Sequence, residues 1–176
     1  MPILTDTVLE SNKYLKINFN GGDLSSDAGL LLIKEFACKL GFINILKKMF
    51  KTNDHASFRY HKDDENLWQV IYQILGAYFE DDCADELTND PILTAILSKK
   101  ALASQPTLSR FFNRMDESTL NQFHDLMRRF RKVVYSVRHP NMILLDLDST
   151  LLNTYGHQEG EGFNFHYRDH GYHPLV

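Results

Sequence analysis

The chain is 176 residues long, with 43% hydrophobic and 24% charged residues, which fits one folded domain or two small ones and excludes wholesale disorder. Its apolar runs are far too short to span a bilayer and no secretory signal pattern opens it, so we expect a cytoplasmic protein without a membrane partner. The net charge of −4 conceals a pattern: residues 101–140 carry seven Lys and Arg against three Asp and Glu, between two acidic segments.

Helical patterns dominate the first 140 residues. An alternating run at 14–19 predicts a short strand, and Ser25 or Ser26 is a candidate cap for a helix that ends near Leu40, before Gly41. Further helices are predicted for 43–50, from Asp63 through the periodic residues to Phe79, from Pro91 after the cap Asn89-Asp90, from 104 or 105 to 115, and for 116–136.

The hydrophobic period changes at Met142. Residues 142–148 predict a strand with carboxylates at its exit, and 163–167 and 172–176 are two further candidates, joined by a turn that contains Gly171. The predicted fold class is therefore α+β, with a helical region at 1–140 and a β region at 141–176. The chain stops inside a strand-like pattern, which predicts a truncated polypeptide.

The end of the first predicted β run carries two carboxylates. Asp146 and Asp148 are two apart, so on a strand both point to the same face. Oxygen ligands of this kind suit Mg²⁺, which activates water and stabilises charge in phosphoryl transfer. The alternative is that both are polar residues flanking an ordinary strand.

The basic block contains a segment like a helix-turn-helix, near residues 90–115. Its second helix, capped by Ser104, would present polar side chains and Arg to phosphates and base edges, namely Gln105, Thr107, Ser109 and Arg110, with Arg114 one turn beyond. The next helix carries a basic cluster suited to DNA phosphates, namely Arg128, Arg129, Arg131 and Lys132. The alternative is a solvated face, since helix C-termini favour cations.

The run Ile143-Leu-Leu-Asp-Leu-Asp-Ser-Thr-Leu-Leu152 resembles the first motif of haloacid-dehalogenase-type phosphatases. That resemblance implies Asp146 as nucleophile and Asp148 as acid/base. Those enzymes also need a later Lys and a second acidic pair, and the 28 residues after Asp148 contain no Lys.

A second resemblance covers nearly the whole chain. The chain resembles the amino-terminal part of DDE transposases of the bacterial insertion-sequence thirteen-eighty family. The matching segments are Gly21-Gly-Asp-Leu-Ser-Ser-Asp-Ala-Gly-Leu-Leu-Leu32, Tyr78-Phe-Glu-Asp-Asp-Cys-Ala-Asp85, Asn89-Asp-Pro91, Ala103-Ser-Gln-Pro-Thr-Leu-Ser-Arg110, Leu145-Asp-Leu-Asp-Ser-Thr150, Tyr155-Gly-His-Gln158 and His170-Gly-Tyr-His-Pro-Leu175. Several ordered matches are far more specific than one pair of aspartates.

This resemblance implies that an RNase H-like catalytic domain begins at about residue 141. Its first strand carries the first of three acidic residues that hold two divalent metal ions, here Asp148, with Asp146 as second choice and Mg²⁺ as the ion. The implied partners are double-stranded DNA at the element's terminal inverted repeats and a second copy of the chain or an intact transposase. The later Asp and Glu of the family are missing, which predicts no cleavage or strand transfer by this chain alone. A non-catalytic DNA-binding remnant or regulator is the nearest alternative.

Overall fold

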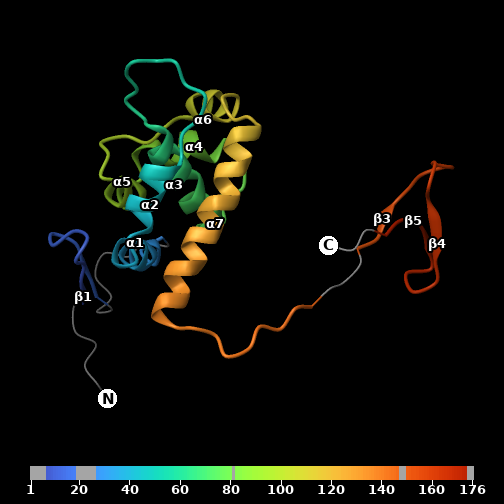
Figure 1. The fold of residues 1–176 in the computed structure, drawn as a ribbon. Coiled ribbons are helices and arrows are strands. Elements are labelled where there is room, and N and C mark those ends of the chain that lie inside the picture. Colours follow the sequence, from blue (N-terminus) through green and yellow to red (C-terminus); the bar gives the residue numbers. More distant parts are fainter. Residues whose placement is uncertain (1–6, 19–26, 81, 147–149, 174–176) are drawn as a thin grey trace. The chain divides into compact units, whose positions relative to one another are not determined.

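The computed structural model describes residues 7–18, 27–80, 82–146 and 150–173. The chain divides into two units, Met1–Arg138 and His139–Val176 (Figure 1). Helices make up most of the described part of the first unit, and a small antiparallel sheet forms the second. The expected mixture of helices and strands is confirmed at this level.

The helices of the first unit follow a short antiparallel hairpin of β1 (Thr7–Val8) and β2 (Lys16–Ile17). They are α1 (Leu30–Lys39), α2 (Phe42–Met49), α3 (Asp63–Leu75), α4 (Cys83–Glu86), the 3-10 turn η1 (Leu87–Asn89), α5 (Pro91–Leu97), α6 (Gln105–Phe112) and α7 (Glu117–Val137). The predicted α2, α5, α6 and α7 are confirmed within a few residues. The α1 helix begins at Leu30, later than predicted, and its candidate caps Ser25 and Ser26 lie outside the described residues.

Local capping sets several of these boundaries. Asp90 Oδ1 accepts a hydrogen bond of 2.7 Å from the Leu93 N–H, with Pro91 at the first helical position of α5. Asp116 caps α7 in the same way through the Thr119 N–H, at 3.0 Å. These caps satisfy backbone donors that the first helical turn leaves unpaired.

The α3 helix ends at Leu75, four residues before the predicted Phe79. Ala77 takes the left-handed conformation, with a φ of 65°, and the Tyr78 N–H donates to the Gln73 carbonyl at 2.9 Å. This is the hydrogen-bonding pattern of a Schellman C-terminus, which satisfies the last carbonyls of a helix. The Tyr78 hydroxyl then donates to Asp27 Oδ2 at 2.8 Å, which raises the pKa of Tyr78. The chain therefore turns away from the helix axis and leaves Phe79 exposed.

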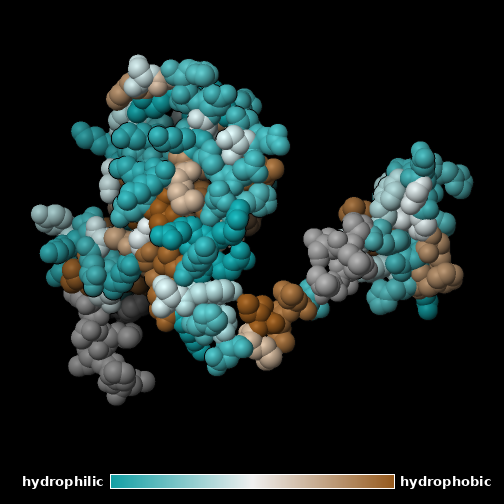
Figure 2. All heavy atoms as spheres, in the orientation of Figure 1, coloured by the Kyte–Doolittle hydropathy of each residue, from teal (hydrophilic) through white to brown (hydrophobic). Residues whose placement is uncertain are grey.

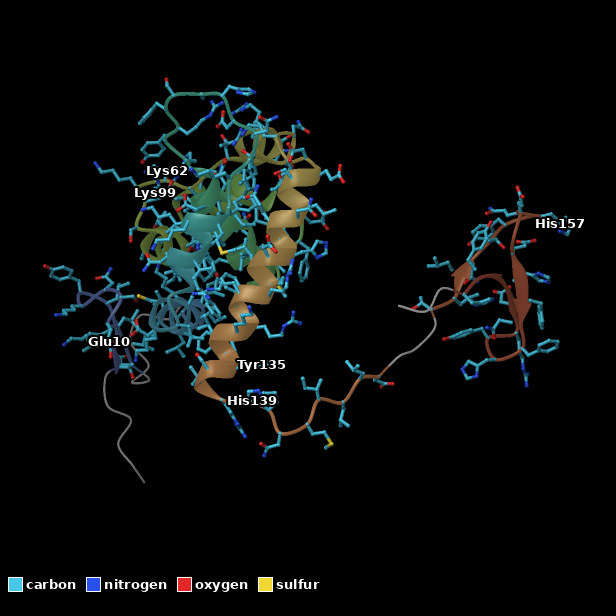
Figure 3. The ribbon with its side chains drawn as sticks, viewed as in Figure 1. Glu10, Lys62, Lys99, Tyr135, His139 and His157 are labelled. Atoms are coloured by element: carbon cyan, nitrogen blue, oxygen red, sulfur yellow. The ribbon has the colours of Figure 1, made fainter. Side chains whose placement is uncertain are left out.

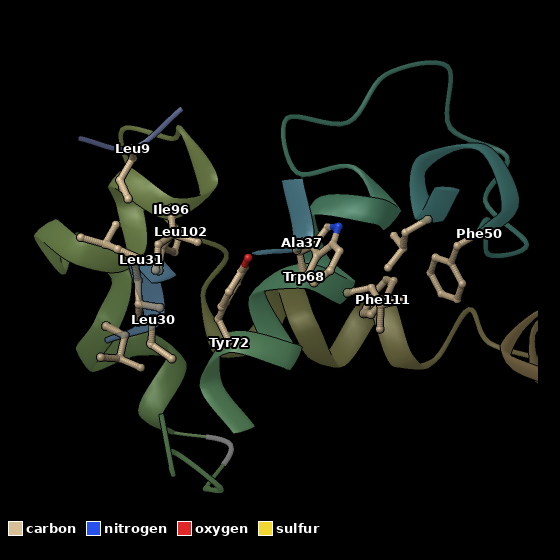
Figure 4. Packing of buried hydrophobic residues seen from close by; sticks show 14 of the residues in the cluster. Leu9, Leu30, Leu31, Ala37, Phe50, Trp68, Tyr72, Ile96, Leu102 and Phe111 are labelled. Atoms are coloured by element: carbon tan, nitrogen blue, oxygen red, sulfur yellow. The ribbon is translucent and has the colours of Figure 1, made fainter. Parts of the chain in front are cut away.

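Aromatic side chains join the helices of the first unit (Figure 4). Trp68 and Tyr72 of α3 stack with their ring centroids 5.6 Å apart. The ring of Phe50 lies edge-on to that of Phe111 of α6, with 6.1 Å between the centroids. Phe50 also contacts Phe123 of α7 at 5.2 Å. Because Phe111 is fully buried, this packing fixes the inner side of α6 and leaves its other side open.

The second unit contains a three-stranded antiparallel sheet in the order β3-β5-β4, formed by β3 (Leu152–Asn153), β4 (Gly162–Asn164) and β5 (Asp169–Tyr172). The predicted strand at 163–167 corresponds to β4, which ends at Asn164, and the one at 172–176 begins inside β5, while its residues 174–176 lie outside the described residues. Gly171 lies inside the central strand, so its predicted place in the turn was wrong. A Cβ on Gly171 would lie 2.4 Å from the Leu152 carbonyl oxygen, which explains the glycine there.

The predicted strand at 142–148 is wrong over its described residues, 142–146, which have no regular secondary structure. Met142, Ile143, Leu144 and Leu145 are all exposed, and brown spheres mark this stretch after α7 in Figure 2. A strand needs a neighbour for its backbone N–H and C=O groups, and no described residue pairs with this run. The hydrophobic pattern alone was therefore an insufficient basis for the prediction.

Candidate nucleic-acid interface

Backbone contacts hold the start of α6, the predicted DNA-reading helix. The buried side chain of Gln69 in α3 forms two hydrogen bonds with Ala103: its Nε2 donates to the carbonyl at 2.7 Å, and its Oε1 accepts from the N–H at 2.8 Å. Asp85 Oδ1 in α4 accepts from the Gln105 N–H at 2.8 Å. Neither contact was predicted from the sequence. Together they fix the direction in which α6 begins.

The four residues predicted for the first turns of α6 divide between different environments. Ser109 and Arg110 are exposed, whereas Gln105 and Thr107 are half-buried. Arg110 Nη2 donates to Thr107 Oγ1 at 3.2 Å. Gln105 and Ser109 line a cavity of about 390 Å³ beside the helix, and Arg110 is not among the residues that line it.

Arg114, the fifth predicted residue of this segment, is engaged inside the first unit. Its Nη2 donates to Asp63 Oδ1 at 3.1 Å, its Nε donates to Thr52 Oγ1 at 3.2 Å, and its Nε lies 3.5 Å from Asp54 Oδ2. Only 17% of the Arg114 side chain is exposed. The structure therefore ties this guanidinium to the loop after α2 and to the start of α3.

Asp54 binds a second arginine at the same place. Arg59 Nε and Nη2 donate to its two carboxylate oxygens at 2.8 and 3.0 Å. These hydrogen bonds, assisted by the Ala56 N–H and the charge of Arg114, hold the pKa of the Asp54 carboxyl well below its usual range. The folded loop therefore favours the charged form of the Asp54 carboxylate.

A different network holds the loop before α3. Lys99 Nζ lies 2.7 Å from Glu65 Oε2, donates to the Tyr60 carbonyl at 2.7 Å and lies over the Tyr60 ring. The N–H of Lys62, the residue before α3, donates to the same Glu65 oxygen at 2.9 Å; Figure 3 labels both lysines. Lys99 therefore serves the packing of this loop.

The basic cluster of α7 is exposed. Arg128, Arg129, Arg131 and Lys132 all face solvent. Arg128 Nη2 lies 2.6 Å from Asp125 Oδ1, and the other three form no ion pair with a residue that the structure describes. Arg128 lies three residues before Arg131 and four before Lys132, and Arg129 lies three before Lys132, so the four side chains are neighbours on one side of α7. Figure 2 shows hydrophilic residues over much of the visible side of α7.

The two predicted DNA-contacting groups lie on separate helices. Arg128 follows the first residue of α7 by eleven positions, which is about 17 Å along a helix axis. The α6 positions Ser109 and Arg110 precede the start of α7. The described contacts do not bring these groups together, so each is a separate candidate surface.

The predicted carboxylates have different outcomes. Asp146 lies in the exposed irregular stretch, and Asp148 lies outside the described residues. Within the part of the chain that the structure describes, no three His, Cys, Asp or Glu side chains gather as a metal site would require. Because Asp148 lies outside the described residues, this absence does not test the expected metal site, and we derive no reaction step through it. None of the described helices is long and apolar enough to cross a membrane.

The sequence matches the family described as Transposase DDE domain group 1 over residues 8–176. Because the match covers nearly the whole of both units, the chain belongs to this family of DDE transposases. Membership supports a function in DNA transposition. It also favours the resemblance of the segment around Asp146 and Asp148 to DDE transposases over its resemblance to haloacid-dehalogenase-type phosphatases. Comparisons with curated proteins and with solved structures gave no significant match.

Proposed function

We propose that the first unit holds double-stranded DNA during transposition, through the exposed basic cluster of α7 and the open side of α6. Transposases as a class bind DNA, and the family match makes that expectation apply to this chain. The observation that carries the proposal is that Arg129 and Lys132 are exposed and free of ion pairs with described residues, beside Arg128. Such side chains can neutralise phosphates and release counterions.

The proposed contacts differ in role. Ser109 and Arg110 would contact the duplex from α6, with Gln105 and Thr107 closer to the helix start, whereas Arg131 would extend the basic cluster of α7. Arg114 is left out because its guanidinium already binds Asp63 and Thr52. The proposed target is the terminal inverted repeats of an insertion sequence of the thirteen-eighty family, since several ordered segments of this chain resemble that family.

The salt dependence of DNA binding tests this proposal. We expect that changing Arg128, Arg129 and Lys132 to Ala makes the plot of log K against log salt less steep. The magnitude of its negative slope should fall by about 0.9 for each phosphate that the variant no longer neutralises, or roughly 2 to 3 in total. The affinity should fall for all duplex sequences, because phosphate contacts carry no direct sequence information. Fluorescence anisotropy of a labelled duplex between about 50 and 200 mM salt gives both quantities.

The matched control removes the same charge elsewhere. Lys13, Lys16 and Lys100 are exposed and lie outside α6 and α7, and changing all three to Ala should leave the slope nearly unchanged. An equal decrease of the slope in both triple variants would mean that net charge alone attracts the DNA, and the α7 assignment would be wrong.

The second part of the proposal concerns the His139–Val176 unit. We infer that it contributes strands to an RNase H-like catalytic fold, with Asp148 as one carboxylate ligand of Mg²⁺ and Asp146 as the second choice. The resemblance around Leu145-Asp-Leu-Asp-Ser-Thr150 and the family match support this assignment. Mg²⁺ held by carboxylates would supply the Lewis acidity for DNA cleavage and strand transfer.

Paramagnetic Mn²⁺ distinguishes the two carboxylates. Added to the ¹⁵N-labelled chain, Mn²⁺ should broaden the amide NMR signals around residues 146–150, because carboxylate oxygens bind it as they bind Mg²⁺. We expect Asp148→Asn to remove most of this broadening and Asp146→Asn to retain it. Broadening that disappears only with Asp146→Asn would transfer the ligand role to Asp146.

A further inference from the structure

A cavity of about 390 Å³ opens between the end of α3, the loop that follows it and the open side of α6. Gln105 and Ser109, which we propose to lie at the DNA interface, line one wall, and Gln73 and Phe79 line another. The cavity therefore adjoins the proposed DNA surface. Its volume exceeds that of one nucleobase and is in the range of small-ligand sites.

One wall holds a polar group without a partner. Gln73 is only 6% exposed, and its Nε2 makes no hydrogen bond with any described residue. A buried amide that lacks a hydrogen-bond partner destabilises the folded chain, so a ligand atom that accepts from it gains binding free energy. Gln73 lines the cavity, but its Nε2 is itself buried, so the side chain has to rotate before this donor reaches a ligand.

Two exposed aromatic rings also line the cavity. Phe79 is 72% exposed and Phe112 is 45% exposed, and both contribute to its walls. The Schellman turn at Ala77 and the hydrogen bond from Tyr78 to Asp27 hold the segment that carries Phe79. Aromatic side chains of this kind stack on the flat rings of nucleobases, and each of the four bases can take part in such stacking.

The charge of the lining determines the kind of ring. Glu80 supplies a carboxylate, and no Lys, Arg or His is among the described residues that line the cavity. A phosphate group would therefore be repelled, whereas exocyclic amino groups can donate to Glu80. Thymine has no amino group, and its ring N–H lies between two carbonyl oxygens. The negative charge of a carboxylate repels these two oxygens. The lining favours adenine, cytosine or guanine over thymine.

We propose that this cavity accepts one unstacked nucleobase from bound DNA, with a preference for bases that carry an amino group. The proposal rests on the proposed DNA-binding function and adds a site to it. Gln73 donates to a ring nitrogen or carbonyl, Glu80 accepts from the amino group, and Phe79 stacks on the ring. The cost of unstacking is lowest where a base is already unpaired.

Binding of bulged duplexes tests the site with the full 176-residue chain. Three labelled duplexes of one sequence are compared by anisotropy: fully paired, with one adenine bulge, and with one thymine bulge. We expect the adenine bulge to bind about tenfold more tightly than the paired duplex, from the free energy of stacking one base. The thymine bulge should gain clearly less, and Glu80→Gln should narrow the difference between the two bulges.

The exposed Phe79 allows a variant that should still fold. Phe79→Ala should abolish the preference for the adenine bulge, whereas Phe58→Ala, which removes a ring that is 78% exposed and lies outside the cavity, should retain it. A bulge preference that survives Phe79→Ala would arise from DNA flexibility and would overturn the nucleobase site. Equal binding of all three duplexes would overturn it too and leave the DNA-binding proposal intact, whereas failure to bind any duplex would contradict that proposal itself.

Discussion

A Gln69→Leu variant should lose about 3 kcal/mol of unfolding free energy, because it leaves the N–H and the C=O of Ala103 unpaired in a buried site, at about 1–3 kcal/mol each. Leu conserves most of the side-chain volume, so the missing hydrogen bonds rather than a cavity account for the effect. Urea unfolding followed by far-UV circular dichroism measures the change.

The chain contains a matched control for this experiment. Gln122 of α7 makes the same pair of hydrogen bonds with the backbone of Lys51, at 2.8 and 3.1 Å, but at an exposed site. Water can replace both partners there, so Gln122→Leu should cost less than about 1 kcal/mol. Similar decreases in the two variants would show that burial does not set the cost.

An Arg114→Ala variant should lose about 2–3 kcal/mol of unfolding free energy. The change removes charge-assisted hydrogen bonds to Asp63 and Thr52 and leaves the half-buried carboxylates of Asp54 and Asp63 without the cation between them. The same variant should keep the salt slope of DNA binding wherever it remains folded, because we assign Arg114 no phosphate contact. Chemical unfolding and anisotropy on one preparation measure both.

Arg59→Ala is the comparison for Arg114→Ala. Arg59 binds the same Asp54, but 48% of its side chain is exposed, so its removal should destabilise the chain clearly less than the removal of Arg114. If Arg114→Ala were as stable as the unchanged chain and lowered the salt slope by about one unit, Arg114 would contact a phosphate after all.

Local signals were sufficient to predict most of the helices. Apolar residues at helical spacing, the Asp90 and Asp116 caps, and Gly41 in the left-handed conformation with a φ of 72° each act over a few neighbouring residues. Such effects can be recognised from sequence alone, because the interacting groups are close along the chain.

Contacts between distant residues were the ones that sequence reasoning missed. Arg114 lies 51 residues from Asp63, and in the sequence it looked like a member of the basic block. Gln69 lies 34 residues from Ala103, and its position in a mostly apolar helix was the one available signal of a buried hydrogen bond. For residues 142–146 the local pattern predicted a strand, but no described strand pairs with them, so the prediction was wrong there. For Asp148 the predicted role remains a prediction.

The two contacts that hold the start of α6 have an evolutionary consequence. Among the described residues, the Gln69 side chain binds only the backbone of Ala103, and the Asp85 side chain binds only the backbone N–H of Gln105. The side chains at 109, 110 and 113 on the outer face therefore take no part in positioning the helix. These residues can change during evolution, or be substituted to alter which DNA is bound, while contacts from α3 and α4 keep the orientation of α6.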